Sequence, residues 1–225
     1  GGGRGSLFQS ANDMATRYET ELQMFRDGMD LGCQVLFSGG TGREGDGGVG
    51  RWSEFLDAGN QDGRRITSIC HTRPSGAFFG LAQLSPFTQK SPAWRELMAL
   101  PTVADRVAEM RKEKTRAKLI AEGIEAGDLR GLAGMLHPFG LNDKPNLDFE
   151  QKSSLAQLAE AEGKDPVEVY VDRLIASEGR EFFNMWMFGG ALENQWNYMR
   201  LPHVVPMLGD AGAHVGQIID SGWPS

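Results

Sequence analysis

The chain has 225 residues, of which 23 are Lys or Arg and 30 are Asp or Glu, so its formal net charge is −7. This acidic balance argues against a dedicated nucleic-acid binder, because phosphate contacts need clustered basic side chains. No apolar run approaches the roughly 20 residues of a membrane span, and the two cysteines make no disulfide framework, so we expect a cytoplasmic protein without a membrane partner.

The first third of the sequence alternates between helix and strand patterns. Residues 11–30 carry apolar side chains at helical spacing, and residues 33–38 follow as a short apolar strand. After a glycine-rich loop, residues 51–58 predict a helix and residues 66–71 a second strand that ends in His71. This alternation is typical of α/β folds with a parallel sheet.

The middle of the chain shows no strand pattern and predicts a mainly helical segment over about 86–178. Its helix starts are marked by Pro92 at a first helical position, by Pro101-Thr102 and by the capping residue Asp165 before a proline. A basic stretch at 111–116 is interpreted as a solvated helix face.

The helix–strand alternation resumes after this segment. Residues 182–188 predict a buried strand, 191–199 a helix, and 203–210 a last strand that ends in Asp210. Pro206 is unusual inside a strand, because proline donates no ladder hydrogen bond.

Polar residues follow three of the predicted strands and could carry chemistry. They are Ser38, His71 and Asp210, and His214 lies four residues beyond Asp210. In barrels and in open parallel sheets the site lies at the carboxyl ends of the strands, so we expect these residues at one edge. An aspartate in this position needs a cation, a metal, a donor or water, although it could instead cap a helix.

Two interpretations of His71 remain open: a structural histidine whose hydrogen bonds are satisfied, or a metal ligand. His203 and His214 are weaker candidates for further metal ligands. Cys70 alternates with His71 along the strand, so we expect Cys70 in the core.

A second interpretation concerns the loop after residue 38. Gly40, Gly42 and Gly45 form a G-x-G-x-x-G pattern, and Asp62 lies twenty residues past Gly42. This spacing matches a dinucleotide-binding fingerprint and predicts a helix that starts near Gly45. Further glycines and the acidic Glu44 and Asp46 weigh against phosphate binding. The alternatives are a mobile substrate-facing loop and a plain connection.

Several segments, in order, resemble the metal-dependent amidohydrolase family that includes the D-aminoacylases, or N-acyl-D-amino-acid deacylases. Residues 209–216 (GDAGAHVG) resemble its SDGGAHVG segment. The similarity covers roughly residues 31–225, and the other matching stretches are 70–76 with 80–81, 92–97 with 100–101, and 163–166.

The resemblance implies a hydrolase of linear amide bonds with a divalent metal, usually zinc, and a small N-acylated amino acid as substrate. It implies that Asp210 is the general base and acid and also a metal ligand, and that His71 is a metal ligand. Ser38, Arg73 and His214 would bind substrate; Arg73 would pair with a carboxylate, with a plain surface role as the alternative.

The implied fold is a partial (β/α)8 barrel over residues 1–225. The strands at 33–38, 66–71, 182–188 and 203–210 would be strands five to eight, with the helical insertion between six and seven. The strand at 33–38 has no histidine at its end, and no H-x-H occurs in the sequence. These departures indicate a less typical branch or a noncatalytic relative. We expect these residues to be a fragment with little activity alone, because a whole barrel needs about 250 residues.

Overall fold

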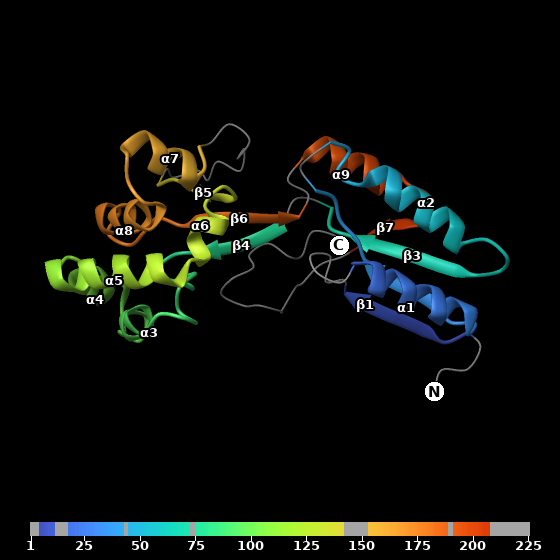
Figure 1. Cartoon of the computed structure of the whole chain (residues 1–225), viewed down its shortest axis with the longest axis horizontal. Coiled ribbons are helices and arrows are strands. Elements are labelled where there is room, and N and C mark those ends of the chain that lie inside the picture. Colours follow the sequence, from blue (N-terminus) through green and yellow to red (C-terminus); the bar gives the residue numbers. More distant parts are fainter. Residues whose placement is uncertain are drawn as a thin grey trace. The chain divides into compact units, whose positions relative to one another are not determined.

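The computed structural model describes residues 5–11, 18–42, 45–72, 75–141, 153–188 and 191–207. These residues divide into two units (Figure 1). The first contains the described residues up to Ser75 and those from Met187 to 207, and the second runs from Gly76 to Trp186. Each unit has its own hydrophobic core.

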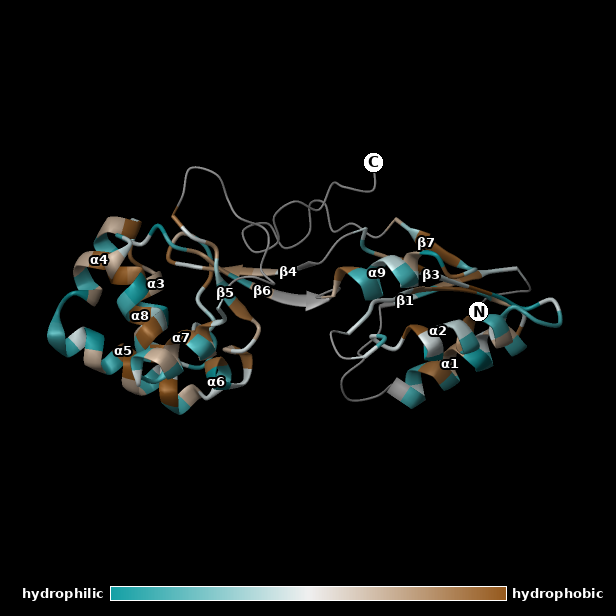
Figure 2. Cartoon of the chain, turned by 90° about the horizontal axis from the view of Figure 1, so that it is seen from above, coloured by the Kyte–Doolittle hydropathy of each residue, from teal (hydrophilic) through white to brown (hydrophobic). Residues whose placement is uncertain are grey.

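The first unit is a parallel sheet with the strand order β1-β2-β3-β7, and every neighbouring pair is parallel. Figure 2 shows α1 and α2 on one side of the strands. Its elements are β1 (Leu7–Ala11), α1 (Tyr18–Asp30), β2 (Gln34–Ser38), α2 (Val49–Gly59), β3 (Arg65–Cys70), α9 (Leu192–Met199) and β7 (Val204–Pro206).

The core of the first unit lies between this sheet and its helices. Alternate strand residues, such as Phe37 on β2 and Ile66 on β3, are fully buried on the helix side. The ring of Phe37 lies 5.4 Å from that of Phe25 on α1 and 5.2 Å from that of Trp52 on α2. Apolar strand faces and amphipathic helices therefore form this layer together.

The second unit is mainly helical and carries a three-stranded sheet with the order β4-β6-β5, in which β5 and β6 are antiparallel. Its buried centre is aromatic: the ring of Tyr170 lies 4.6 Å from Phe183, 5.8 Å from Phe87 and 6.0 Å from Trp94. Its elements are β4 (Ser75–Phe79), α3 (Pro92–Met98), α4 (Val103–Met110), α5 (Glu113–Ala126), α6 (Asp128–Leu132), β5 (Leu136–Pro138), α7 (Leu155–Glu162), α8 (Pro166–Ala176) and β6 (Phe183–Phe188).

Helix starts in the second unit follow local sequence signals. The Ser91 side chain accepts from the Trp94 amide at the start of α3, and Thr102 accepts from the Asp105 amide at the start of α4. Asp165 caps α8, whose first residue is proline. The predicted starts at 91–92, 101–102 and 165–166 are confirmed, because a capping side chain satisfies amides that the helix leaves free.

The α/β class with a parallel sheet is confirmed, but three strand predictions need correction. The strand at 182–188 was predicted to lie between the strands ending in His71 and Asp210; instead β6 belongs to the second unit's sheet, and β7 pairs directly with β3. Strand β1 (Leu7–Ala11) was not predicted, and residue 11, the expected first residue of a helix, is its last residue. The helix itself is α1, Tyr18–Asp30. Strand β5 lies in the helical segment predicted to have no strand, and β4 is a further strand that was not predicted, just before that segment. Apolar content showed that β6 is buried but not which strands it pairs with.

Across the described parts of the chain, every helix is too short or too polar to cross a lipid bilayer.

Candidate functional site

The carboxyl ends of β2, β3 and β7 lie side by side in the first unit. Ser38 at the end of β2 is level with Ile69 on β3, and Cys70 is level with Pro206 on β7. His71 follows β3 directly, and both Ser38 and His71 are half-buried. Strand geometry places the Cα atoms of Ser38 and His71 roughly 8 Å apart. The expectation that these two residues share one edge is therefore consistent with the sheet.

Three of the predicted site residues, Arg73, Asp210 and His214, lie outside the described residues. Asp210 follows Met207, the last described residue, by three positions. The strand that leads toward Asp210 is thus the direct neighbour of the strand that ends at His71.

His203, a reserve ligand from the sequence, lies at the other end of this strand. It comes immediately before β7, is exposed, and has a positive φ of 66°. Its carbonyl oxygen accepts a hydrogen bond from the Ser68 amide. Because it precedes β7, His203 lies away from the carboxyl edge and does not join His71.

Helix α9 fixes the loops that follow β2 and β3. The Gln195 amide nitrogen donates to the carbonyl of His71 at 2.5 Å, and its oxygen accepts from the Thr41 hydroxyl at 3.2 Å. Asn194 donates to the carbonyls of Gly42 and Gly45 at 3.3 and 3.1 Å. Gln195 is only 3% exposed, so its hydrogen bonds are shielded from water. A buried polar group without a hydrogen-bond partner would lower the stability of the fold. The backbone at the carboxyl edge is therefore held in place.

A second buried contact supports the first glycine of the loop. The hydroxyls of Ser68 and Tyr198 lie 2.7 Å apart, and both side chains are fully buried. A Cβ on Gly39 would overlap both hydroxyls. Gly39 is therefore needed for close approach of the backbone to this pair rather than for a turn. Trp52 on α2 donates to the next carbonyl, that of Gly40, at 3.2 Å.

The nucleotide-binding interpretation meets an obstacle at the start of α2. This helix begins at Val49, not near Gly45. The carboxylate of Asp46 accepts from the amides of Gly50 and Gly48, each at 2.8 Å, and these two bonds hold the pKa of Asp46 below its usual range. The amides that would bind a pyrophosphate are thus already engaged by a carboxylate of the chain itself.

Metal ligands are few in the described part of the chain. No group of three or more His, Cys, Asp or Glu side chains there could hold an ion. Cys70 is buried, as predicted, and burial raises the pKa of its thiol to about 11, so the free thiol stays protonated at neutral pH. Of the two proposed ligands, the structure describes His71, whereas Asp210 lies outside the described residues. A catalytic zinc site takes about three protein ligands.

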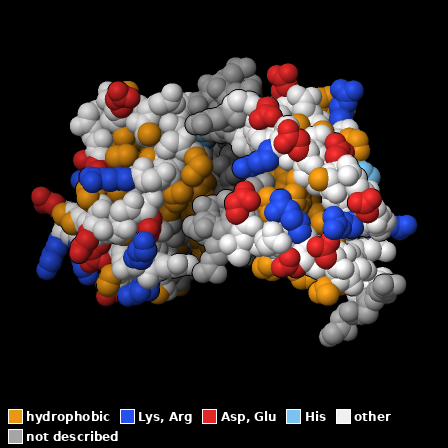
Figure 3. All heavy atoms as spheres, turned by 45° about the vertical axis from the view of Figure 1, so that its right-hand side comes forward, with side chains coloured by type: hydrophobic (Ala, Val, Ile, Leu, Met, Phe, Trp, Pro, Cys, Tyr) orange, Lys and Arg blue, Asp and Glu red, His pale blue; other side chains and the backbone are white. Residues whose placement is uncertain are grey.

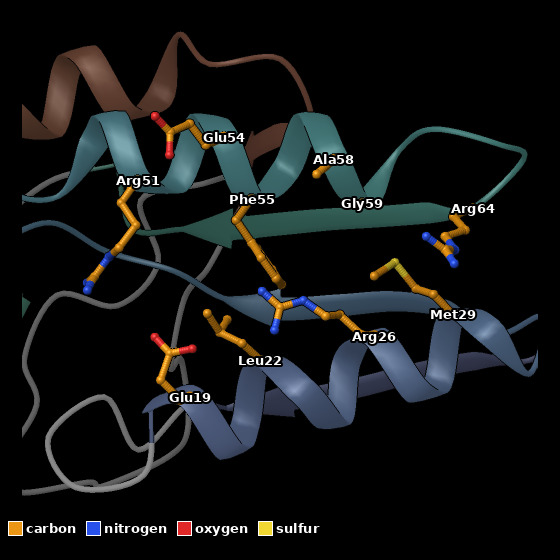
Figure 4. Close-up of a pocket in the computed structure, with 10 residues that line it drawn as sticks. All are labelled: Glu19, Leu22, Arg26, Met29, Arg51, Glu54, Phe55, Ala58, Gly59 and Arg64. Carbon is orange, nitrogen blue, oxygen red and sulfur yellow. The ribbon is translucent and has the colours of Figure 1, made fainter.

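A groove of about 330 Å³ lies between α1 and α2, a feature that the sequence did not indicate. Its floor is apolar and its rim is charged, and Figure 3 shows apolar side chains among charged ones on this helical surface. The Arg26 guanidinium lies 5.5 Å from the ring centre of Phe55. In Figure 4, Glu19 and Arg51 extend from facing helices toward one end of the groove. The groove lies among the helices rather than at the carboxyl edge of the sheet.

The residues that sequence reasoning missed are those of α9. Asn194, Gln195 and Tyr198 share the buried face of this helix, although two of them are amides. The sequence did contain a signal for them, namely polar residues on the face of an amphipathic helix that is expected to be buried. Such residues indicate hydrogen-bond partners elsewhere in the chain, because buried polar groups need partners.

No protein-family model, no curated protein and no solved structure matches this chain.

Proposed function

We propose that this chain carries part of the active site of a hydrolase of linear amides that acts on small N-acylated amino acids, as in the D-aminoacylase branch of the amidohydrolases. The observation that carries the proposal is the adjacency of β2, β3 and β7 in one parallel sheet. Adjacent carboxyl ends are where parallel α/β folds assemble their sites. Ser38, His71 and the segment leading to Asp210 belong to these three strands.

In the proposed reaction, water attacks the acyl carbonyl carbon. The Asp210 carboxylate takes a proton from the water as the new C–O bond forms, then gives it to the amine as the C–N bond breaks. The products are a carboxylic acid and a free amino acid. One aspartate can serve both steps because it regains its charge when the amine leaves.

The other residues of the proposal bind and orient. His71 sits on a backbone whose carbonyl is held by Gln195, so its position is fixed before substrate arrives. Ser38 lies on the neighbouring strand end. Arg73 and His214 complete the proposed substrate site, with the Arg73 guanidinium matching the substrate carboxylate.

A divalent metal, usually zinc, is the cofactor that the sequence resemblance implies. Where bound in such enzymes, it lowers the pKa of a water molecule. Among the described residues only His71 is a proposed ligand, fewer than the three protein ligands of a catalytic zinc site.

The test uses the natural protein that carries this sequence, as wild type and as Asp210→Asn. Both are assayed with zinc on N-acetyl-D-amino acids and on the L-enantiomers, with release of the free amino acid as the readout. Loss of a general base lowers turnover by about 10²–10⁴-fold. The matched control is Asp62→Asn, an exposed aspartate in the turn before β3 with a φ of 55°, which asparagine tolerates well.

Equal activity of the wild type and Asp210→Asn would overturn the assignment of Asp210. Absence of activity in the wild type on every acyl amino acid, together with no metal by elemental analysis, would support a noncatalytic relative instead.

A further inference from the structure

The hydrogen-bond ladder of β3 stops one residue before His71 in the described part of the sheet. Ile69 is the last residue of this strand paired with β2, and Cys70 is the last one paired with β7. The next carbonyl along the chain, that of His71, instead accepts a hydrogen bond at 2.5 Å from the Gln195 side chain of α9. This side chain therefore extends the bonding of the sheet by one residue, at the position proposed to work in the site.

The orientation of the Gln195 amide follows from its two neighbours. A backbone carbonyl only accepts hydrogen bonds, so the amide atom that faces His71 is the nitrogen. The amide oxygen then faces Thr41, whose hydroxyl donates to it at 3.2 Å. The two bonds run in one direction, from Thr41 to Gln195 and from Gln195 to His71. A carboxylate in place of this amide would have no donor for the His71 carbonyl, because both of its oxygens accept.

The two side chains of this connection are shielded from water. Thr41 is 4% exposed and Gln195 is 3% exposed. Water is therefore not at hand to replace a lost partner, and a buried polar atom left without one is unfavourable. The chain regains a lost bond here only by moving the backbone or side chain that carries the other partner. A change at Thr41 should for this reason be felt at His71.

The glycine-rich loop between β2 and α2, on which Thr41 lies, is held at further points in its described part. Trp52 on α2 donates to the Gly40 carbonyl at 3.2 Å. Asn194, the neighbour of Gln195 on α9, donates to the Gly42 carbonyl at 3.3 Å and to a second carbonyl three residues later. The hydroxyl of Thr41 therefore starts from a fixed backbone.

Helix α9 is placed to connect all three strand ends of the proposed site. It lies beside α2 (Figure 1), and its side chains bond to the loop after β2 and to the residue after β3. It ends at Met199, only five residues before β7 begins at Val204. The same helix thus holds two of the strand ends and leads directly into the third strand.

We propose that Gln195 is a positioning residue, the middle of a relay of two hydrogen bonds through which the glycine-rich loop sets the position of His71. The relay consists of Thr41, Gln195 and the His71 carbonyl. The loop then has a supporting role in the site in place of a phosphate-binding one. The importance of the relay for catalysis rests on the proposed function, whereas the position of His71 is measurable without it.

Two substitutions break the relay one bond at a time. Thr41→Val keeps the shape of the side chain and removes the donor to Gln195. Gln195→Glu keeps the acceptor for Thr41 and, at about pH 8, well above the ordinary pKa of glutamate, removes the donor to His71. Thr41→Ser keeps the hydroxyl and is the conservative variant. The matched control is Gln23→Glu, the same chemical change at an exposed glutamine of α1.

The first readout is the NMR signals of the His71 ring and of the Thr72 amide in the natural protein that carries this sequence. The relay predicts that both signals shift in Thr41→Val and in Gln195→Glu, and that they keep their wild-type positions in Thr41→Ser and Gln23→Glu. Unchanged signals in Thr41→Val would overturn the relay. Unchanged signals of the second unit show that a variant is folded, and Thr41→Val, the milder change, decides the result if Gln195→Glu does not fold.

The second readout is hydrolysis of N-acetyl-amino acids at the same pH. A displaced site residue slows the chemical step more than it weakens binding, so Thr41→Val should lower kcat by roughly tenfold or more and change KM by less than about twofold. Thr41→Ser should restore kcat. An unchanged kcat in Thr41→Val, in a protein whose wild type is active, would overturn the positioning role.

The two readouts separate this inference from the proposed function. An inactive wild type would contradict the proposed function, and the NMR signals of Thr41→Val would still decide whether the relay positions His71. An active wild type with unshifted His71 signals in Thr41→Val would support the function and overturn the relay.

Discussion

The two units stabilise themselves in different ways. In the second unit, α3, α4, α7 and α8 begin with side-chain caps, and charged pairs such as Arg116–Asp172 and Arg173–Glu181 join its helices to neighbouring segments. In the first unit, α2 and α9 have no side-chain cap. Its buried polar contacts gather instead where the strands end, among them Thr41–Gln195 and Ser68–Tyr198.

We interpret the second unit as a scaffold and the first unit as the carrier of the proposed site. Polar groups in the second unit complete helices and surfaces, which is what a self-contained helical fold requires. Polar groups in the first unit hold loops at the carboxyl edge of a parallel sheet, which is where chemistry is placed in such folds.

The largest expected effect is at Gly39 in the first unit. A Cβ there would overlap the hydroxyls of Ser68 and Tyr198, so Gly39→Ala should lower the free energy of unfolding by about 3 kcal/mol through overpacking and a lost buried hydrogen bond. Gly28→Ala is the control, because a Cβ at this position in the last turn of α1 meets only the Val35 side chain at 3.8 Å. It should be neutral or stabilising by up to about 1 kcal/mol.

Chemical denaturation measures the total effect, and hydrogen exchange locates it. The Gly39 variant should lose protection in β2, β3 and α9 before the second unit does. Uniform loss across both units would contradict the division.

The next largest expected effect is the pH-dependent contribution of Asp172 to the free energy of unfolding. Burial raises the pKa of Asp172, but hydrogen bonds from Arg116 and Lys164 outweigh it and leave the pKa below its usual range. A lowered folded-state pKa gives stability that is present above the unfolded value near 4 and lost as pH falls through the folded one. Asp172→Asn should therefore cost about 1–2 kcal/mol at pH 7, and less as pH approaches 3.

The matched variant in the first unit is Asp30→Asn, which removes an exposed pair with Arg64. Surface pairs contribute little, so the change should stay within about 0.5 kcal/mol. Urea denaturation between pH 3 and pH 7 measures both. A pH-independent cost at Asp172, or a larger cost at Asp30, would contradict this ranking.

The smallest expected effect is the change in stability when either of two buried tyrosines loses its hydroxyl group. Tyr170 and Tyr198 are both fully buried, but the Tyr198 hydroxyl bonds to Ser68, whereas that of Tyr170 has no hydrogen-bond partner among the described residues. Tyr198→Phe should therefore cost about 1 kcal/mol, and Tyr170→Phe should gain about as much by removing an unsatisfied buried group. Thermal unfolding distinguishes the two signs; equal signs would contradict the contrast between the units.

Much of the fold was predictable where the signals are local. Ser91, Thr102 and Asp165 announce helix starts because a cap acts within one turn of the chain. Strand β1 was missed because its five residues include polar Gln9 and Ser10 and give no apolar run. The sheet to which β6 belongs could not be read from the sequence, because apolarity predicts burial and not the pairing partner.

Of the proposed site, only the residues at the ends of strands could be predicted from the sequence. Ser38 and His71 were identified from their places after apolar runs, and the sheet places them at one edge. The partners that hold this edge, Gln195 and Tyr198, lie more than a hundred residues away in sequence and were not found. Contacts of this kind depend on tertiary packing rather than on any local pattern.

The central claim is that chemistry belongs to the carboxyl edge of the parallel sheet, and two histidines at opposite ends of this sheet test it most directly. The natural protein, labelled at its histidine rings, is titrated with Zn²⁺ and followed by NMR, with His71→Gln and His203→Gln to assign the signals. The account predicts that the His71 ring signals shift and those of His203 do not. A shift at His203 with none at His71, or no shift at either residue, would contradict it.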